Sequence, residues 1–367
     1  MLPLDSADER EINRKLEGIE KQHWPLRHHF ELATPGKQHQ VATRVQCEHQ
    51  FNQEEYVAVA HAAIAPKKKS RRYRRVLGVL ALLVMVLAGL FYMRPLLVAR
   101  QAQQMGMWMR GIHRHNVQLG AYRIHYLEAG TGHPLVFVHG LGGSAENWLG
   151  MIPQFTAQGF HVYALDLLGF GHSDKPDVDY SIGMQADLLL QFLDSQGLQQ
   201  PDVAGWSMGG WVTGKFAVEH PQRVRRIILL DSAGLRYEGV KPSVLRPTTL
   251  NELSFMMASL TPHPQAIPAF FGRDMLRAMQ QGDWVVGRTL QSMYTGKDLL
   301  DDKLQNVKVP ALIVWGKQDM VTPLVIAEQM HKSMPQSVLY VVDGCGHLAP
   351  TDCQDRIIPE MKKFLSQ

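Results

Sequence analysis

The sequence predicts an α/β fold with a mostly parallel central sheet, helices on both faces, a helical cap insertion and a single N-terminal transmembrane helix. Three observations support this prediction. From residue 117 onward, short aliphatic or β-branched runs alternate with amphipathic segments. A long stretch without a strand signal interrupts the alternation. An uncharged apolar run stands before the whole alternating region. Such alternation is typical of parallel sheets that are covered by helices.

The composition is that of a globular protein with one large domain. Of the 367 residues, 45% are hydrophobic and 20% are charged, which is enough apolar surface for a full core. The basic excess comes from one segment: residues 67–75 hold seven Lys and Arg and no acid, whereas residues 94–367 hold 24 basic and 24 acidic residues. The folded part is therefore neutral, and we expect no nucleic-acid partner.

The first 75 residues are expected to be a polar tail that ends in this basic cluster. Residues 1–66 carry seven basic residues, ten acidic residues and six histidines. His28 and His29 could bind a metal, but no third ligand stands at a useful spacing. We therefore expect a solvated tail and no metal site.

Residues 76–93 are the predicted core of a transmembrane helix. These 18 residues are uncharged and strongly apolar, and at about 1.5 Å per residue they nearly cross a hydrocarbon layer of about 30 Å. Residues 96–98 extend the span if the Arg94 side chain reaches the interface, which gives a span over residues 76–98. A buried core helix is the alternative, but the basic cluster immediately upstream favours a membrane span.

The charges that flank this span predict its orientation. Seven Lys and Arg precede it, whereas Arg94, Arg100 and Arg110 follow it. The positive-inside rule places the N-terminus in the cytoplasm and the C-terminal domain on the far side, which is periplasmic, extracellular or lumenal. A cleaved signal peptide is disfavoured because 75 residues precede the apolar run. We therefore expect an uncleaved signal anchor, followed by a linker over residues 99–116.

The domain over residues 117–367 consists of seven predicted strands and an insertion. The insertion, at about residues 236–305, has no comparable strand signal. A structureless loop of that length is improbable in a compact domain, so we expect a mostly helical cap. The predicted strands are residues 122–127, 134–138, 161–165, 201–206, 226–230, 311–315 and 337–342.

A nucleophile motif follows the fourth predicted strand. The segment Gly205-Trp206-Ser207-Met208-Gly209 has the pattern Gly-x-Ser-x-Gly and stands between a strand and a helical stretch. The glycines allow a tight strand-to-helix turn, which exposes the serine hydroxyl at the carboxyl edge of the sheet. We expect Ser207 to be the nucleophile.

A glycine-rich segment, HGLGG over residues 139–143, follows the second predicted strand. In this context, backbone N–H groups can point at a developing oxyanion. We assign the oxyanion hole to the N–H groups of Leu141 and Met208.

Two further residues complete a predicted catalytic triad. A serine hydroxyl requires a general base, and the base requires a group that fixes its tautomer. His347 follows the last predicted strand and Asp319 follows the strand before it, at the edge where Ser207 is expected. The chain order Ser, Asp, His agrees with these roles. Asp231 ends the strand 226–230 and is a competitor for the role of Asp319.

Substrate contacts are assigned to Trp148, Trp206, Met256 and Phe271. The last two lie in the cap, which is rich in methionine. Thioether side chains adapt to irregular shapes and suit a flexible acyl chain, although core packing explains the methionines equally well.

The cysteines indicate neither a disulfide framework nor a structural zinc. The chain has three, Cys47, Cys345 and Cys353, without a CxxC pair or a Cys/His group at zinc spacing. Cys345 and Cys353 could pair in an oxidising compartment, but the simpler expectation is two thiols that are reduced or buried.

From about residue 118 to its C-terminus, the chain resembles the α/β-hydrolase superfamily. The segments HGLGGSAENW, DLLGFGHSD, GWSMGG, DSAGL and WGKQDMVTP carry the resemblance. They are most similar to the membrane-anchored abhydrolase-domain monoacylglycerol lipases and to related bacterial lipases and esterases. The resemblance implies an α/β-hydrolase fold and ester hydrolysis without a cofactor, through an acyl-enzyme intermediate.

We therefore expect a carboxylic ester hydrolase that acts on lipid or monoacylglycerol-type esters. A carbon–carbon bond hydrolase and a cofactor-free haloperoxidase use the same triad and remain alternatives. Epoxide hydrolases and haloalkane dehalogenases are disfavoured because they use an aspartate where this chain has Ser207. A hypothesis of another class is a catalytically silent membrane scaffold, which would not require the triad and the oxyanion motif together.

Overall fold

The computed structural model of the chain describes residues 71–237 and 241–367. Residues 84–367 form one compact unit, and the earlier described residues belong to another. Several predictions cannot be compared with the structure. The polar tail, with His28, His29 and Cys47, lies outside the described residues. Most of the basic cluster lies there too or has side chains that are not described.

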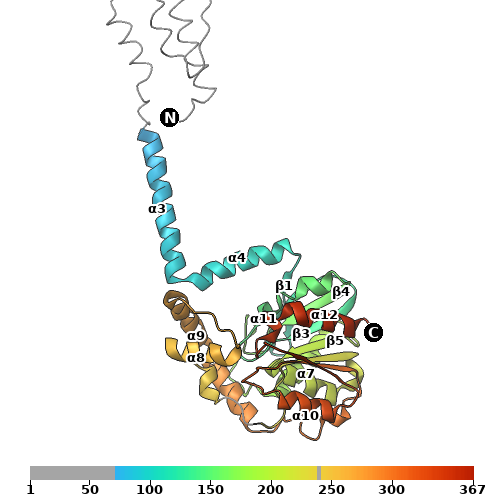
Figure 1. Cartoon of the computed structure of the whole chain (residues 1–367). Coiled ribbons are helices and arrows are strands. Elements are labelled where there is room, and N and C mark those ends of the chain that lie inside the picture. Colours follow the sequence, from blue (N-terminus) through green and yellow to red (C-terminus); the bar gives the residue numbers. More distant parts are fainter. Residues whose placement is uncertain (1–70, 238–240) are drawn as a thin grey trace, which may run out of the picture. The chain divides into compact units, whose positions relative to one another are not determined.

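An eight-stranded sheet forms the centre of the domain (Figure 1), with the strand order β1-β2-β4-β3-β5-β6-β7-β8. Strands β3 to β8 pair in parallel, whereas β1 pairs with β2, and β2 with β4, in antiparallel fashion. The predicted mostly parallel α/β fold is confirmed. The strands are β1 (His113–Leu119), β2 (Tyr122–Ala129), β3 (His133–Val138), β4 (Phe160–Leu165), β5 (Asp202–Trp206), β6 (Arg226–Leu230), β7 (Ala311–Gly316) and β8 (Val338–Val342).

Strand β1 was not predicted. Residues 99–116, expected to be a linker, form a helix and the first half of this strand. Its sequence, HRHNVQL, lacks apolar alternation, and most of its residues are exposed or half-buried. A tight turn at Gly120, which has a positive φ of 54°, holds β1 against β2 in a register from His113↔Glu128 to Leu119↔Tyr122. An edge strand of this kind is specified by its partner more than by its own hydrophobicity.

Helices cover both faces of the sheet. Along β3, Val136 and Val138 point into one hydrophobic cluster, and Leu135 and Phe137 into the other, as the alternation of a strand requires. The core therefore lies in two layers on either side of the sheet. The first layer includes residues of α6 (Ile182–Ser195), α7 (Met208–Glu219) and α10 (Val325–Ser333), and the second includes residues of η1 (Ala145–Trp148), α5 (Ile152–Thr156), α11 (Ala349–Asp352) and α12 (Gln354–Leu365).

The predicted helical insertion stands between β6 and β7. Its main elements, α8 (Leu250–Leu260) and α9 (Ala269–Tyr294), lie together at one side of the domain (Figure 1). Helix α8 begins with a capping box. The Thr249 side chain accepts a hydrogen bond from the Glu252 N–H, and the Glu252 side chain accepts one from the Thr249 N–H. The two helices bury a small apolar cluster of their own. Short helices η3 (Pro242–Leu245) and η4 (Leu304–Asn306) flank them, and η2 (Pro221–Arg223) precedes β6.

Two helices precede the sheet, α3 (Arg71–Met93) and α4 (Pro95–Met109). Among the described residues, one stretch, Arg75–Met93, is long and apolar enough to cross a membrane, with a mean hydropathy of 2.7 and no part of it buried. The expected extension of this span over residues 96–98 is not continuous with α3. Arg94 has non-helical dihedrals (φ −139°, ψ 58°), and Pro95 begins α4 as a separate helix.

Candidate active site

Ser207 occupies a strained turn between β5 and α7. Its φ of 56° and ψ of −119° are unusual for a residue with a side chain. The turn requires both motif glycines, because a Cβ on Gly205 would stand 2.1 Å from the Gly209 carbonyl oxygen and one on Gly209 would stand 2.2 Å from that of Val138. The Ser207 side chain is only half-buried. The turn therefore presents its hydroxyl at the carboxyl edge of the sheet.

The structure brings Ser207, His347 and Asp319 into one hydrogen-bonded chain. Ser207 Oγ is 2.8 Å from His347 Nε2, and His347 Nδ1 is 2.7 Å from Asp319 Oδ2. Asp319 follows β7 and His347 follows β8, so both lie at the edge that carries Ser207. His347 and Asp319 are buried. If the imidazole donates from Nδ1 to the carboxylate, its Nε2 lone pair is free to accept from the serine hydroxyl.

Thr322 holds the carboxylate and was missed in the sequence. Its hydroxyl donates to Asp319 Oδ2 at 2.7 Å, and its N–H, with that of Val321, donates to Asp319 Oδ1 at 2.9 and 2.7 Å. These donors fix the carboxylate and leave Oδ2 facing His347. The sequence did contain a signal for this contact: Thr322 stands three residues after Asp319, a spacing at which a side chain can hydrogen-bond locally.

Asp231, the competitor for the acid, does not contact the histidine. Its Oδ1 accepts from Gly316 N–H at 2.7 Å, and its buried Oδ2 has no hydrogen-bond partner among the described residues. Burial, and then the nearby charge of Asp319, raise the pKa of Asp231 well above its ordinary value. Burial therefore disfavours the ionised form of Asp231, which lies beside the hydrogen-bonded chain.

The loop of His347 is held from two sides. The Trp206 indole N–H donates to the His347 carbonyl at 2.8 Å, and Leu348 N–H donates to the Leu260 carbonyl at the end of α8 at 3.1 Å. A Cβ on Gly346 would stand 2.7 Å from the same Leu260 oxygen. Trp206, predicted to contact substrate, thus braces the loop that carries His347, and the cap touches that loop directly.

A disulfide joins Cys345 to Cys353, two residues before and six residues after His347. The expectation of two unpaired thiols is therefore wrong. The short helix α11 turns the chain back, so that the two Cα atoms are 6.5 Å apart, within the usual range for a disulfide. The Arg356 guanidinium lies against both sulfur atoms, at 2.7 and 3.0 Å. The bridge closes the segment that carries the histidine.

The glycine-rich loop lies beside the serine. A Cβ on Gly140 would stand 3.1 Å from Ser207 Cβ, so a side chain there would press on the serine and glycine eases the close approach. Buried His139 accepts from Leu167 N–H through Nε2 at 3.0 Å, so its Nδ1–H donates to the Gly140 carbonyl at 2.7 Å. Burial lowers the pKa of His139, which keeps it neutral in this role. Leu141 follows in this loop, and Met208 is the first residue of α7, where an N–H has no acceptor within its own helix.

The remaining predicted substrate contacts lie at different depths. Trp148 is only 1% exposed and stacks on Phe137 in the core, with ring centroids 4.5 Å apart. Because an enclosed side chain offers no surface to a ligand, we exclude Trp148 from the substrate contacts. Met256 is buried in the apolar cluster of the cap, and Phe271 is half-buried on α9.

Tyr237, at the start of the cap, interacts electrostatically with Asp319. Burial, and then the charge of Asp319, raise the pKa of the Tyr237 phenol, so it stays protonated. This residue stands where the chain leaves the sheet for the cap and was not singled out in the sequence. Among the described residues, no group of three His, Cys, Asp or Glu side chains is placed to hold a metal ion.

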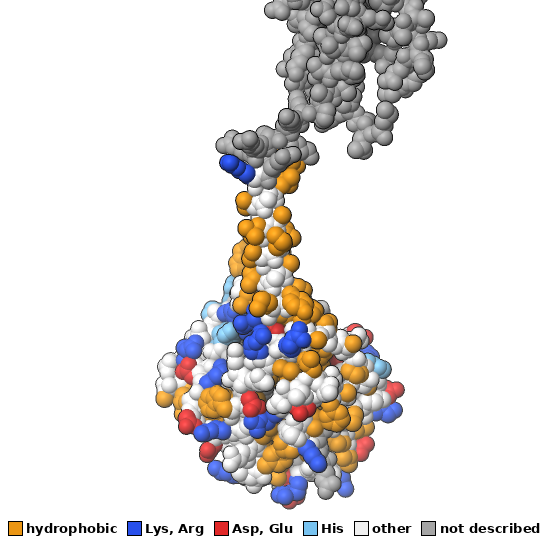
Figure 2. All heavy atoms as spheres, turned by 90° about the vertical axis from the view of Figure 1, so that its left-hand side faces the viewer, with side chains coloured by type: hydrophobic (Ala, Val, Ile, Leu, Met, Phe, Trp, Pro, Cys, Tyr) orange, Lys and Arg blue, Asp and Glu red, His pale blue; other side chains and the backbone are white. Residues whose placement is uncertain are grey.

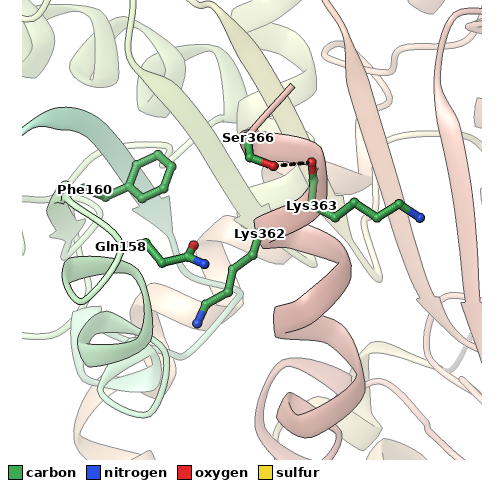
Figure 3. Close-up of a pocket in the computed structure, with 5 residues that line it drawn as sticks. All are labelled: Gln158, Phe160, Lys362, Lys363 and Ser366. Carbon is green, nitrogen blue, oxygen red and sulfur yellow. Dashed lines mark hydrogen bonds between the residues drawn. The ribbon is translucent and has the colours of Figure 1, made fainter.

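An open hollow lies elsewhere on the domain. Figure 3 shows its lining side chains, which come from the C-terminal end of α12 and the residue after it, from the start of β4 and from the segment that precedes β4. None of them belongs to the hydrogen-bonded chain of Ser207. The lining residues are Gln158, Phe160, Lys362, Lys363 and Ser366.

A model of the alpha/beta hydrolase fold family matches residues 133–352 of the chain. An uncharacterised protein of Mycobacterium tuberculosis is 30% identical over 66% of this chain and 78% of that protein. Lipase 1 of Psychrobacter immobilis is 28% identical over 66% of this chain and 80% of its own length.

Two further similar proteins have other names. The 2-hydroxy-6-oxo-6-(2'-aminophenyl)hexa-2,4-dienoic acid hydrolase of Metapseudomonas resinovorans is 29% identical, over 68% of this chain and 90% of that enzyme. Among solved structures, a bacterial membrane phospholipase A, described as a virulence factor, is 26% identical with a TM-score of 0.70. This match covers 80% of this chain and 98% of the phospholipase chain.

Proposed function

Because the chain belongs to the alpha/beta hydrolase family, we propose that it is a serine hydrolase that cleaves carboxylic esters through an acyl-enzyme, with lipid or monoacylglycerol-type esters as substrates. The observation that carries the proposal is the hydrogen-bonded chain from Ser207 through His347 to Asp319. This is the arrangement that a serine nucleophile needs for its activation.

In the proposed mechanism, Ser207 Oγ attacks the acyl carbon while His347 Nε2 takes the hydroxyl proton. Asp319 stabilises the imidazolium that forms. The N–H groups of Leu141 and Met208 are proposed to donate to the oxyanion. His347 then protonates the departing alcohol, and a water molecule, activated by the same nitrogen, releases the acid and restores Ser207.

Three observations support a lipid ester as the substrate. Lipase 1 and the membrane phospholipase A are among the similar proteins. The stretch Arg75–Met93 has the length and hydropathy of a membrane span, which would keep the domain beside lipid. The cap that adjoins the His347 loop is apolar, and we propose that Met256 and Phe271 of this cap contact the acyl chain.

We also propose that α3 is a signal anchor with the domain on the far side of the membrane. The basic residues that precede the apolar run 76–93 support this orientation. The Cys345–Cys353 disulfide supports it independently, because disulfides persist in oxidising compartments and are rare in the cytosol. Protease added outside intact cells or spheroplasts is expected to digest the domain and spare the tail. Digestion of the tail alone would reverse the orientation.

The ester hydrolase proposal is tested with the purified full chain and its Ser207→Ala variant. Both are assayed for fluorophosphonate labelling and for hydrolysis of p-nitrophenyl esters and a monoacylglycerol. We expect labelling and turnover in the natural chain and neither in the variant. Absence of labelling and turnover from both proteins would contradict the proposal and favour the silent scaffold.

A carbon–carbon bond hydrolase is the second candidate function. The 29% identity to a dienoic acid hydrolase over 90% of that enzyme favours it. The same purified chain is tested on a 2-hydroxy-6-oxohexa-2,4-dienoate, whose conjugated chromophore disappears on cleavage. Loss of this absorbance without ester turnover would replace the ester proposal by the second candidate.

A further inference from the structure

Helix α4 carries an exposed apolar face that the domain does not cover. Five of its large apolar side chains are exposed, with Met105, Trp108 and Met109 at 61%, 72% and 73%. At 100° per residue, all five fall within a sector of about 120°. The face consists of Leu97, Val98, Met105, Trp108 and Met109.

The opposite side of α4 is fixed to the domain. Met107 is buried in the core layer that also contains Ile112. At the start of the helix, buried Asp274 of α9 accepts from Leu96 N–H at 3.0 Å and from the Arg277 guanidinium at 2.6 Å, and it pairs with Arg94 at 3.4 Å. Because both ends of α4 are held, the direction of its exposed face is set by the fold.

The chemistry of the face fits a lipid surface. Helix α4 contains no acidic residue, and its charges come from Arg100 and from Arg94 and Arg110 at its two caps. Arginine next to exposed tryptophan and methionine suits the boundary between anionic headgroups and acyl chains. Only Arg94 separates α4 from the apolar stretch Arg75–Met93. Figure 2 shows hydrophobic side chains along α3.

We propose that α4 is an interfacial helix whose apolar face binds the bilayer surface. The proposal rests on the proposed membrane anchor, because the chain then enters α4 directly from the lipid. A second copy of the chain is the competing occupant. The continuity with the apolar stretch and the arginines favour lipid, because a membrane surface is present wherever α3 is inserted.

The consequence concerns the cap. Helix α4 packs on α9, and Phe270 of α9 stacks on Tyr92 with ring centroids 5.3 Å apart. The end of the neighbouring helix α8 contacts the His347 loop through Leu260 and Leu348. Binding of the α4 face to the bilayer would therefore hold the cap at the lipid surface, where an ester can pass to Ser207 without crossing water.

The direct test uses the full chain in vesicles of phosphatidylcholine and phosphatidylglycerol. Fluorescence is measured in vesicles with lipids brominated near the headgroup, and the contribution of Trp108 is obtained by comparison with Trp108→Phe. Trp284→Phe is the matched control, because Trp284 is also exposed, at 42%, but lies in the second half of α9. We expect bromine to quench the Trp108 contribution and not that of Trp284. An unquenched Trp108 would overturn the proposal. If Met105→Cys copies then also cross-link to each other, the face binds a second copy of the chain instead of lipid.

A second readout separates this proposal from the ester hydrolase proposal. Met105→Asp is expected to lower turnover of a long-chain monoacylglycerol in vesicles about tenfold, equivalent to about 1.4 kcal/mol of surface binding. Turnover of soluble p-nitrophenyl butyrate should not change. Ala99→Asp, an exposed position of α4 outside the apolar sector, is the matched control and should leave both rates unchanged. Equal loss of long-chain turnover in Met105→Asp and Ala99→Asp would contradict a role for the apolar face of α4. A natural chain without any ester turnover would refute the ester hydrolase proposal. The quenching result would still decide whether α4 binds the bilayer.

Discussion

Replacement of Asp231 by asparagine tests the reasoning about the two neighbouring carboxyl groups. Asp231 is fully buried, its Oδ2 has no partner among the described residues, and Asp319 lies nearby. The folded-state pKa of Asp231 is therefore raised well above 3.8. In the unfolded chain, the same carboxyl titrates in its ordinary range.

The sign of the effect follows from proton binding. Above the unfolded pKa, the unfolded chain releases the Asp231 proton, whereas the folded protein keeps it. Stability is therefore full below the unfolded pKa and is lost as the pH rises towards the folded pKa. The slope is about 1.4 kcal/mol per pH unit for this one group. Asparagine cannot ionise, so the variant should not undergo this loss of stability and should be more stable than the natural chain at neutral pH.

The assay is chemical unfolding of the detergent-solubilised full chain and Asp231→Asn at several pH values from 4 upward. We expect the difference in the free energy of unfolding to grow with pH in favour of the variant. Ester turnover should be retained, because Asp319 contacts His347 and Asp231 does not. A difference that is independent of pH would refute a neutral Asp231, and loss of turnover as severe as in Asp319→Asn would refute the assignment of the acid.

Three other predictions concern the hydrogen-bonded chain and its loop. Asp319→Asn should lower kcat for p-nitrophenyl esters by roughly a thousandfold or more, because the histidine loses the partner that fixes its tautomer; a loss below tenfold would contradict that role. Thr322→Val removes the hydroxyl that donates to Asp319 and should lower kcat/KM about tenfold, as expected for a hydrogen bond to a charged group. An unchanged rate and an unchanged pH–rate profile would show that the hydroxyl does not position Asp319. Replacement of both Cys345 and Cys353 by serine opens a short loop and should reduce the free energy of unfolding by about 2.5 kcal/mol. The measurement is a denaturant titration of the variant and of the natural chain, with and without reductant. A natural chain whose stability does not change with reductant would contradict a stabilising disulfide.

The parts of the site that depend on local sequence were predictable. The turn at Ser207 is set by Gly205 and Gly209, which stand within two residues of it, and the strands that precede Asp319 and His347 are apolar enough to recognise. The central sheet was predictable for the same reason, because buried parallel strands are continuous apolar runs.

The parts that depend on distant contacts were not predictable. Trp206 is within the motif, but its indole bonds to a carbonyl 141 residues away, which no local pattern records. Trp148 was expected to contact substrate, whereas its stacking on Phe137 fills the core. The pairing of Cys345 with Cys353 depends on the turn made by α11.

The beginning of the domain was missed for a related reason. Strand β1 is polar because it lies at the edge of the sheet, and only its pairing with β2 defines it. Helix α4 has an exposed apolar face, so its sequence resembles a continuation of the membrane span. The non-helical Arg94 and its pairing with Asp274 mark the end of α3, and that pairing spans 180 residues of chain.

The central claim is that Ser207 forms an acyl-enzyme with the help of His347. It is tested most directly by mass spectrometry of the full chain after brief reaction with a p-nitrophenyl ester and acid quenching. We predict one acyl group per chain, on the peptide that contains Ser207, and no adduct in Ser207→Ala or His347→Ala. An adduct on another residue, or ester turnover that survives in Ser207→Ala, would contradict the account.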